Sequence, residues 1–181
     1  MSHIPPKNPE DTSGAHKALF DEIKGTFGVI PNMFKVIGNS SAALESMWTS
    51  FGALGKGKLG AKLGEQIAVL VADMNHCGYC LSAHTLLGKK AGASEEEMSE
   101  AQAGRSSHPK TQAALNFAAA LVRERGQISK SDIEDVRKAG FSDEEIAEIL
   151  AHVALNIFTN YTNEAFNVEI DFPKINLRQA A

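Results

Sequence analysis

Apolar residues recur at helical spacing along most of this chain, and this periodicity is the strongest constraint on its fold. Over residues 62–74, for example, Leu63, Ile67, Leu70 and Met74 share one helix face at about 100° per residue. We find no convincing pattern of the apolar and polar alternation that indicates strands. An all-α fold is therefore predicted, with helices over about 15–28, 31–37, 40–54, 62–74, 77–91, 94–104, 109–125, 129–140 and 142–161.

Capping signals mark several of the helix ends. Ser94 with Glu97 and Ser142 with Glu145 have the spacing of capping boxes, in which the serine begins a helix. We expect Asn75 to cap the helix that begins near Cys77.

The chain is long enough for one domain with a full core. Its 181 residues are few for two domains. The polar, proline-rich residues 1–14 read as an N-terminal arm, residues 15–181 as a single domain, and the last 13 residues as an extended tail.

Composition excludes several classes of protein. Apolar residues make up 43% and charged residues 22% of the sequence, and the formal net charge is −4. The sequence has no basic block of the kind that binds nucleic acid. No apolar run approaches the ~18 residues of a membrane span. The N-terminus lacks the apolar core of a secretory signal, so we expect a cytoplasmic protein that binds neither nucleic acid nor membranes.

The two cysteines, Cys77 and Cys80, form a C-x-x-C pair. Two cysteines in so long a chain are no disulfide scaffold, and in a reducing compartment such a pair indicates redox chemistry or metal binding. With Cys77 at the start of a helix, Cys80 and His84 each lie about one turn further on, so the three side chains fall within roughly 60° of arc. We expect this face to pack against the helix that carries Glu65.

Glu65 has an unusual position on its own helix. It lies opposite the main apolar stripe, among small apolar residues such as Ala61, Ala68 and Ala72. A carboxylate in such a setting is buried with a partner or lies at a helix contact, so we predict a functional role for Glu65.

This arrangement suits thiol redox chemistry. A helix N-terminus and a nearby imidazolium both stabilise a thiolate, and the i,i+3 spacing permits a disulfide. His84 can accept a thiol proton, and Glu65 can orient the imidazole or relay its proton. Attack of one thiolate on a peroxide gives a sulfenic acid. The second thiol then condenses with this sulfenic acid to form a disulfide. The residues alone leave open which cysteine is attacked first.

Three other interpretations of the cysteine pair remain. A zinc site could use both cysteines and His84 with His76 as a fourth ligand, although the sequence has no second C-x-x-C. A thioredoxin-type dithiol expects a βαβ context, which is absent. Both cysteines could also be structural residues of the core.

Other eye-catching residues carry weaker signals. Tyr79 lies on the far side of its helix from the cysteines, so we expect it in core or subunit packing, and we interpret Trp48 as a core residue. The remaining histidines lack a constellation and are expected at the surface or in packing: His3, His16, His108 and His152.

A weak internal repeat relates two parts of the chain. Residues 65–72, EQIAVLVA, match residues 144–151, EEIAEILA, at an offset of 79. At that offset the positions of Cys77, Cys80 and His84 correspond to Asn156, Thr159 and Asn163. The second copy has the helical pattern without the redox residues. Chance similarity of amphipathic helices and a duplicated helical unit both explain it.

The pattern E-x11-C-x-x-C-x-x-x-H, formed by Glu65, Cys77, Cys80 and His84, resembles the AhpD-like alkylhydroperoxidase branch of the carboxymuconolactone decarboxylase superfamily. The segments FGVIPNMF and NYTNEAFNVEIDFP are similar to that family as well. The resemblance implies an all-α fold with a repeated helical unit and a homo-oligomer, commonly a trimer or hexamer, with the site near subunit contacts.

The resemblance also implies roles. Cys80 matches the peroxide-reactive cysteine, Cys77 the resolving cysteine, and His84 and Glu65 the proton-relay residues. Family members often have a histidine just before the second cysteine, where this chain has Tyr79.

We therefore expect a thiol-dependent peroxidase in antioxidant defence, without a cofactor or metal, that uses a hydroperoxide substrate and a dithiol or protein reductant. The alternatives are a disulfide oxidoreductase of the same fold, a decarboxylase-type lyase and a non-enzymatic metal-binding protein. The decarboxylase branch generally lacks the cysteine pair, which favours the peroxidase.

Overall fold

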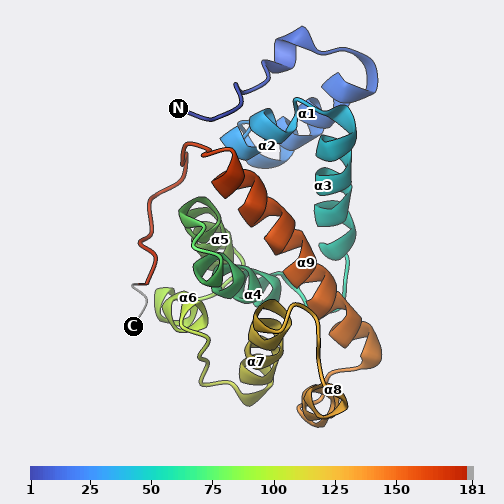
Figure 1. Ribbon diagram of the computed structural model, residues 1–181, viewed down its shortest axis with the longest axis vertical. Helices are drawn as coiled ribbons and strands as arrows, with labels where there is room; N and C mark the ends of the chain where they lie inside the picture. The colour runs from blue at the N-terminus through green and yellow to red at the C-terminus, as the bar shows by residue number, and fades with distance from the viewer. Residues whose placement is uncertain (179–181) are drawn as a thin grey trace.

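The computed structural model describes residues 1–178 and is all-α, as predicted (Figure 1). No strand occurs within that range. A short 3-10 helix, η1 (Pro9–Asp11), precedes the α-helices. These are α1 (Gly14–Phe27), α2 (Asn32–Ile37), α3 (Ser41–Leu54), α4 (Ala61–Met74), α5 (Gly78–Lys90), α6 (Glu95–Gln102), α7 (Pro109–Arg123), α8 (Lys130–Lys138) and α9 (Asp143–Ala165).

Helix α4 is the hub of the packing. It contacts α5, α6, α7 and α9. The side chains of Ile67, Val69, Leu70 and Val71 are at most 4% exposed, because apolar residues occupy more than one face of this helix. Burying each of these side chains stabilises the fold by about 1.5–3 kcal/mol.

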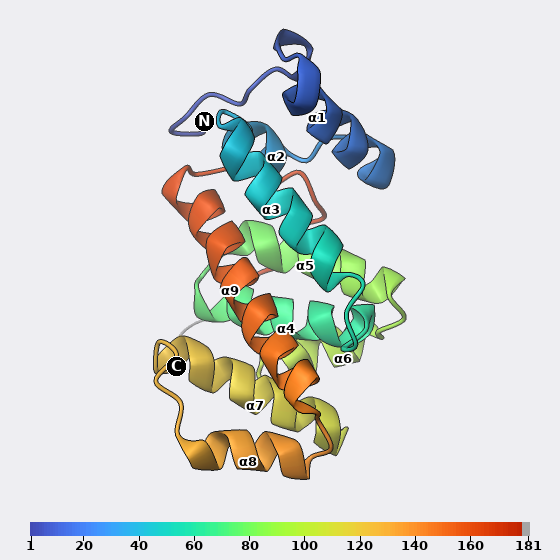
Figure 2. The same ribbon diagram turned by 90° about the vertical axis from the view of Figure 1, so that its right-hand side faces the viewer.

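The long helix α9 links the two ends of the molecule. It runs past the group formed by α1, α2 and α3 at one end and reaches α7 and α8 at the other (Figures 1 and 2). One side of α9 contacts α3, while α4 and α5 also pack against it. Helix α5, which carries Cys80, therefore packs against both α4 and α9.

The helix starts follow their predicted caps with one exception. Ser94 and Ser142 form complete capping boxes with Glu97 and Glu145, and Ser129 forms one as well. Asn75 does not cap α5, however. The chain makes a turn at 75–76, where His76 has a left-handed φ of 56°, and Cys77 is the N-cap. The cap lies two residues later than predicted because this turn separates α4 from α5.

The N-terminal arm and the C-terminal segment as far as residue 178 both pack on the helices. In the N-terminal arm, the His3 amide donates to the Phe166 carbonyl at 2.8 Å. The C-terminal segment after α9 is extended, as expected, and crosses α5, where the Ile175 amide donates to Ser82 Oγ at 3.0 Å. The last three residues of the expected tail, 179–181, lie outside the described residues. None of the helices in residues 1–178 has the length and apolar character needed to cross a membrane.

The two matching sequence segments have different helical layouts. Residues 65–84 form most of α4, a turn and the first half of α5, whereas residues 144–163 lie within the single helix α9. Each layout is all-helical, but only the first has a new helix N-terminus at the cysteine pair.

Candidate active site

The cysteine pair occupies the first turn of α5. The Cys77 amide donates to the Ala72 carbonyl at 2.8 Å, which fixes the sharp connection from α4. As N-cap, Cys77 accepts a hydrogen bond at its Sγ from the Cys80 amide at 3.4 Å. Both cysteines are free and buried. The spacing thus brings the two sulfurs together at a helix N-terminus, where unpaired N–H groups favour a thiolate.

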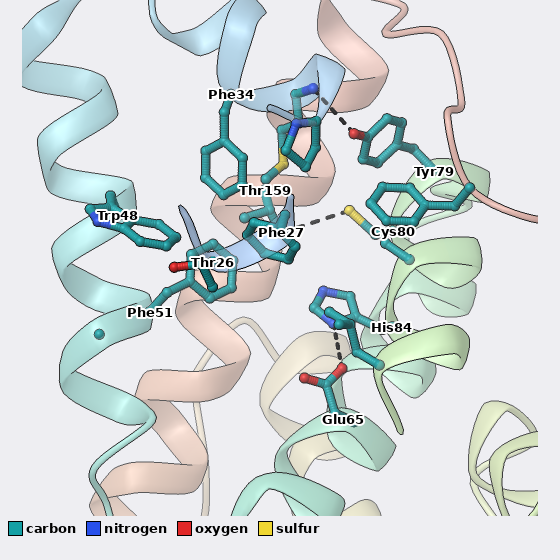
Figure 3. Close-up of a pocket in the computed structure, with 16 residues that line it drawn as sticks. Thr26, Phe27, Phe34, Trp48, Phe51, Glu65, Tyr79, Cys80, His84 and Thr159 are labelled. Atoms are coloured by element: carbon teal, nitrogen blue, oxygen red, sulfur yellow. Dashed lines mark hydrogen bonds and ion pairs between the residues drawn. The ribbon is translucent and has the colours of Figure 1, made fainter. Parts of the chain in front are cut away.

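His84 and Glu65 form a close pair across α4 and α5. His84 Nδ1 lies 2.7 Å from Glu65 Oε2, and the side chains are 9% and 22% exposed respectively (Figure 3). Burial alone lowers the pKa of His84, but the charge of Glu65 and this hydrogen bond outweigh it and raise the pKa above its ordinary value. The predicted packing of this face against the helix of Glu65 is therefore present, and the pair favours an imidazolium.

The two thiols have opposite acidities. Burial raises the pKa of Cys80, but the hydrogen bond with Cys77 and the positive charge of His84 outweigh it and lower this pKa to about 6. The side-chain hydrogen bond with Cys80, followed by burial, raises the pKa of Cys77, and the bond from the Cys80 backbone amide only partly offsets this. These opposite shifts favour a thiolate at Cys80 and a neutral thiol at Cys77, which suits nucleophilic attack by Cys80.

A cavity of about 440 Å³ opens onto Cys80. The side chains of Cys80, His84 and Glu65 lie along one side of it, and an aromatic group from α1, α2 and α3 lies across from them (Figure 3). This group, which we call the aromatic wall, comprises Phe27, Phe34, Trp48 and Phe51. The ring centroids of Phe34 and Trp48 are 5.7 Å apart, in an edge-to-face arrangement that fixes both rings.

Tyr79 packs in the core as predicted, with 3% exposure. It also lines the cavity beside Cys80, although face counting placed it on the far side of the helix. Its hydroxyl accepts a hydrogen bond from the Met33 amide at 3.2 Å, and its ring lies 5.5 Å from that of Phe172. The cavity is lined by residues from more than one face of α5, so assigning residues to helix faces does not predict that Tyr79 and Cys80 share it. Trp48 likewise lines the cavity rather than being only a core residue.

The other histidines are outside this cavity lining. His152 packs on α4, where a Cβ on Gly64 would lie 3.0 Å from its ring. His16 stacks on Phe20 with 5.3 Å between ring centroids. Among residues 1–178 no group of three or more His, Cys, Asp or Glu side chains has the geometry of a metal site.

The sequence interpretation missed the groups of α9 behind Cys80. Cys80 Sγ lies 3.8 Å from Thr159 Oγ1, and Asn163 Nδ2 donates to the same sulfur at 3.1 Å. The repeat offset pairs the position of Thr159 with that of Cys80, and this pairing was the one signal in the sequence that related them.

The comparisons with known proteins agree with this fold. Residues 42–124, which contain all four predicted site residues, match the model of the Carboxymuconolactone decarboxylase family. A comparison with curated protein sequences gives no match.

Several solved structures share the architecture. An uncharacterized peroxidase-related protein from Ralstonia eutropha JMP134, described as an alkylhydroperoxidase AhpD core, is 20% identical with a TM-score of 0.86, over 94% of this chain and 92% of that one. A peroxidase-related protein from Silicibacter sp. TM1040 is 23% identical with a TM-score of 0.79, over 92% and 94% of the two chains. A cysteine-to-alanine variant of the debrominase Bmp8, in complex with 2,3,4-tribromopyrrole, is 20% identical with a TM-score of 0.80, over 94% and 92%.

Proposed function

The chain belongs to the carboxymuconolactone decarboxylase superfamily, with an AhpD-like fold, and from this premise we propose that it reduces organic hydroperoxides with the Cys77–Cys80 dithiol. The fold and the family support a peroxidase-related enzyme. The observation that carries the finer proposal is the unequal thiol pair beside the His84–Glu65 pair, at the edge of an apolar cavity.

The proposed reaction has two chemical steps in the protein. The Cys80 thiolate attacks the terminal oxygen of the hydroperoxide, the O–O bond breaks, and the alkoxide leaves as an alcohol after taking one proton. Cys80 is then a sulfenic acid. The Cys77 thiol attacks its sulfur, which releases water and forms the Cys77–Cys80 disulfide. An external dithiol reduces this disulfide and is itself oxidised, which restores both thiols.

His84 and Glu65 act on the protons of these steps. The imidazolium of His84 stabilises the Cys80 thiolate and can donate a proton to the leaving alkoxide. Glu65, through its 2.7 Å contact with Nδ1, leaves Nε2 as the nitrogen that faces the reaction and keeps the ring charged.

The cavity supports a neutral, apolar substrate. Its volume of about 440 Å³ exceeds the needs of hydrogen peroxide and lies in the range of small-molecule sites. Among the described residues that line it, none is a lysine or arginine that could pair with a carboxylate or phosphate, and the His84 imidazolium is already paired with Glu65. We therefore propose a bulky organic hydroperoxide, for which cumene hydroperoxide is a suitable probe.

The test is peroxide consumption by the reduced protein with dithiothreitol as reductant. Wild type is expected to consume cumene hydroperoxide, and Cys80→Ser to lose this activity. After removal of the dithiothreitol, Cys77→Ser is expected to make one attack and then stop at the sulfenic acid. Full turnover by Cys80→Ser would refute the assignment.

Three further measurements separate the alternatives. A disulfide oxidoreductase would reduce a disulfide substrate and leave the hydroperoxide untouched. A decarboxylase-type lyase would keep lactone decarboxylation after both cysteines are changed to serine. A metal-binding protein would retain about one zinc per chain through purification.

A second candidate is reductive removal of halogen from an aromatic ring. The aromatic wall opposite Cys80 favours it, since flat rings pack well against such side chains. Two thiols would supply two electrons, so that an aryl bromide and the dithiol give the arene, bromide, a proton and the disulfide. Release of bromide from 2,3,4-tribromopyrrole by wild type but not by Cys80→Ser would support it.

We also propose that the protein is a cytoplasmic homo-oligomer, a trimer or hexamer. Leu150, Phe158 and Tyr161 expose apolar surface along α9, with exposed fractions of 51%, 36% and 62%. Such a patch is typical of an association surface. Light scattering of purified protein would give the subunit number, and a monomer would refute the proposal.

A further inference from the structure

Helix α9 turns a stripe of polar side chains toward the core. Asn156, Thr159, Asn160 and Asn163 follow one another at i, i+3, i+4 and i+7, so they lie on one helix face. All four are at most 4% exposed. Burying such groups is unfavourable unless they find hydrogen-bond partners, so the partners indicate what the stripe is for.

Two members of the stripe contact the sulfur of Cys80. Asn163 Nδ2 donates to Cys80 Sγ at 3.1 Å and also lies 3.3 Å from Met33 Sδ. Thr159 Oγ1 lies 3.8 Å from Cys80 Sγ, and its hydroxyl is within 3.0 Å of the Asn156 carbonyl (Figure 3). Because a hydroxyl can rotate, Thr159 can accept from the thiol or donate to the thiolate.

The side-chain amide of Asn160 has one N–H donor group without a hydrogen-bond partner. Its Oδ1 accepts a hydrogen bond from Asn75 Nδ2 at 2.9 Å, which fixes the orientation of the amide. Its Nδ2 is buried and has no hydrogen-bond partner in the dithiol form. The Asn160 amide is nevertheless close enough to Cys80 to contribute to lowering the pKa of that thiol. Asn160 directly follows Thr159, whose Oγ1 lies 3.8 Å from Cys80 Sγ, so its unpartnered N–H is suited to an oxygen added to that sulfur.

We propose that Asn163 makes Cys80, rather than Cys77, the attacking thiol by donating an N–H group to its thiolate, and that Asn160 donates its free N–H group to the oxygen of the Cys80 sulfenic acid. The first part stands on the geometry of the reduced protein, and the second part rests on the peroxidase function proposed above. The Cys77 sulfur accepts only the longer hydrogen bond from the Cys80 backbone amide, at 3.4 Å, and no α9 amide within residues 1–178 forms a hydrogen bond with it.

The contribution of α9 differs in kind from that of His84. The titratable groups around Cys80 are Cys77, Tyr79 and His84 with its partner Glu65, on α4 and α5. α9 adds only neutral groups to the contacts of this sulfur. The amide donors therefore keep favouring the Cys80 thiolate at a pH at which the imidazole is neutral.

The reaction is the same two-electron oxidation of Cys80 that was proposed above, and the α9 amides donate to the atoms that carry negative charge. The Cys80 sulfur is oxidised as it bonds to the terminal peroxide oxygen, the hydroperoxide is reduced to an alcohol, and one proton goes to the leaving oxygen. The new sulfenic oxygen is an acceptor that the thiol lacked, and it matches the free Nδ2 of Asn160. Water leaves when Cys77 closes the disulfide.

The test is titration of the two thiols of the reduced protein in the absence of peroxide. Thiolate absorbance gives the total, and NMR of isotope-labelled cysteine Cβ atoms distinguishes Cys80 from Cys77. Leucine is close in size to asparagine, and Asn163→Leu is expected to raise the titration midpoint of the Cys80 thiol by roughly one pH unit. At a pH below both midpoints, this is a roughly tenfold loss of thiolate. Asn163→Ala serves if the leucine variant does not fold, as judged by circular dichroism.

Asn156→Leu is the matched control, since it removes a buried amide from the same face of α9 whose Nδ2 bonds only within that helix, to the His152 carbonyl at 2.8 Å. It is expected to leave the Cys80 midpoint unchanged. An unchanged midpoint in folded Asn163 variants, or an equal change in the control, would overturn the proposal. The titration uses no peroxide, so a protein without peroxidase activity but with the expected midpoints would refute the proposed function alone.

Discussion

Replacing Glu65 with glutamine tests the pair on which the charge of His84 depends. Glu65→Gln keeps the shape of the side chain and removes its charge. Glu65 Oε2 lies 2.7 Å from His84 Nδ1, and neither side chain is more than 22% exposed, so solvent screens the pair only weakly. A hydrogen bond of this charged kind contributes about 1.5–3 kcal/mol. We expect Glu65→Gln to lose that amount of unfolding free energy at about pH 6.

The sign of the pH dependence follows from the direction of the pKa shift. The folded-state pKa of His84 is raised above its ordinary value of 6.5. Burial lowers this pKa, but the charge of Glu65 and its hydrogen bond raise it by more. The stabilisation is therefore fully present below the unfolded pKa and is lost as pH rises through the folded pKa. The difference between wild type and Glu65→Gln should be largest near pH 6 and shrink toward about pH 9.

Urea unfolding of the reduced proteins at both pH values measures this difference. Glu95→Gln is the control, because Glu95 is 86% exposed in its contact with Lys89 and should change stability by less than about 0.5 kcal/mol at either pH. The peroxidase rate of Glu65→Gln should also fall by roughly 10²-fold at neutral pH. An equal loss of stability at both pH values, or none at the lower one, would refute the charge assignment.

Three further changes test other parts of the structure. Phe51→Ala opens the aromatic wall and should raise KM for cumene hydroperoxide about tenfold, with little effect on hydrogen peroxide, in steady-state kinetics. Gly88→Ala places a Cβ onto the Met98 side chain and 3.3 Å from Glu65 Cβ, so the unfolding free energy should fall by about 1–3 kcal/mol in urea. Ser94→Ala removes a complete capping box and should cost about 1 kcal/mol of stability while thiol titration stays unchanged, since α6 lies outside the cavity lining.

Local signals in the sequence predicted most of the fold. The apolar period and the serine caps are properties of short segments, so they identified the helices and several of their starts. The spacing of Cys77, Cys80 and His84 likewise placed them on one helix face. Glu65 was identified because a carboxylate among small apolar residues needs a partner, and that partner is His84.

The parts that the sequence did not predict depend on contacts between distant segments. Thr159 and Asn163 reach Cys80 only because α9 packs against α5, and helical period does not say which polar face meets which neighbour. Tyr79 was assigned away from the cysteines by face counting, but it lines the same cavity at the helix start. The aromatic wall is built from three helices, so no single segment of the sequence reveals it.

The most direct measurement of the central claim is the fate of the two sulfurs after one equivalent of cumene hydroperoxide. Peptide mass spectrometry of the wild type should find a Cys77–Cys80 disulfide, with one alcohol formed per disulfide. Cys77→Ser should instead hold a sulfenic acid on Cys80, which dimedone traps. Sulfurs that stay reduced while the hydroperoxide is consumed, or a sulfenic acid on Cys77 in Cys80→Ser formed at the wild-type rate, would contradict the account.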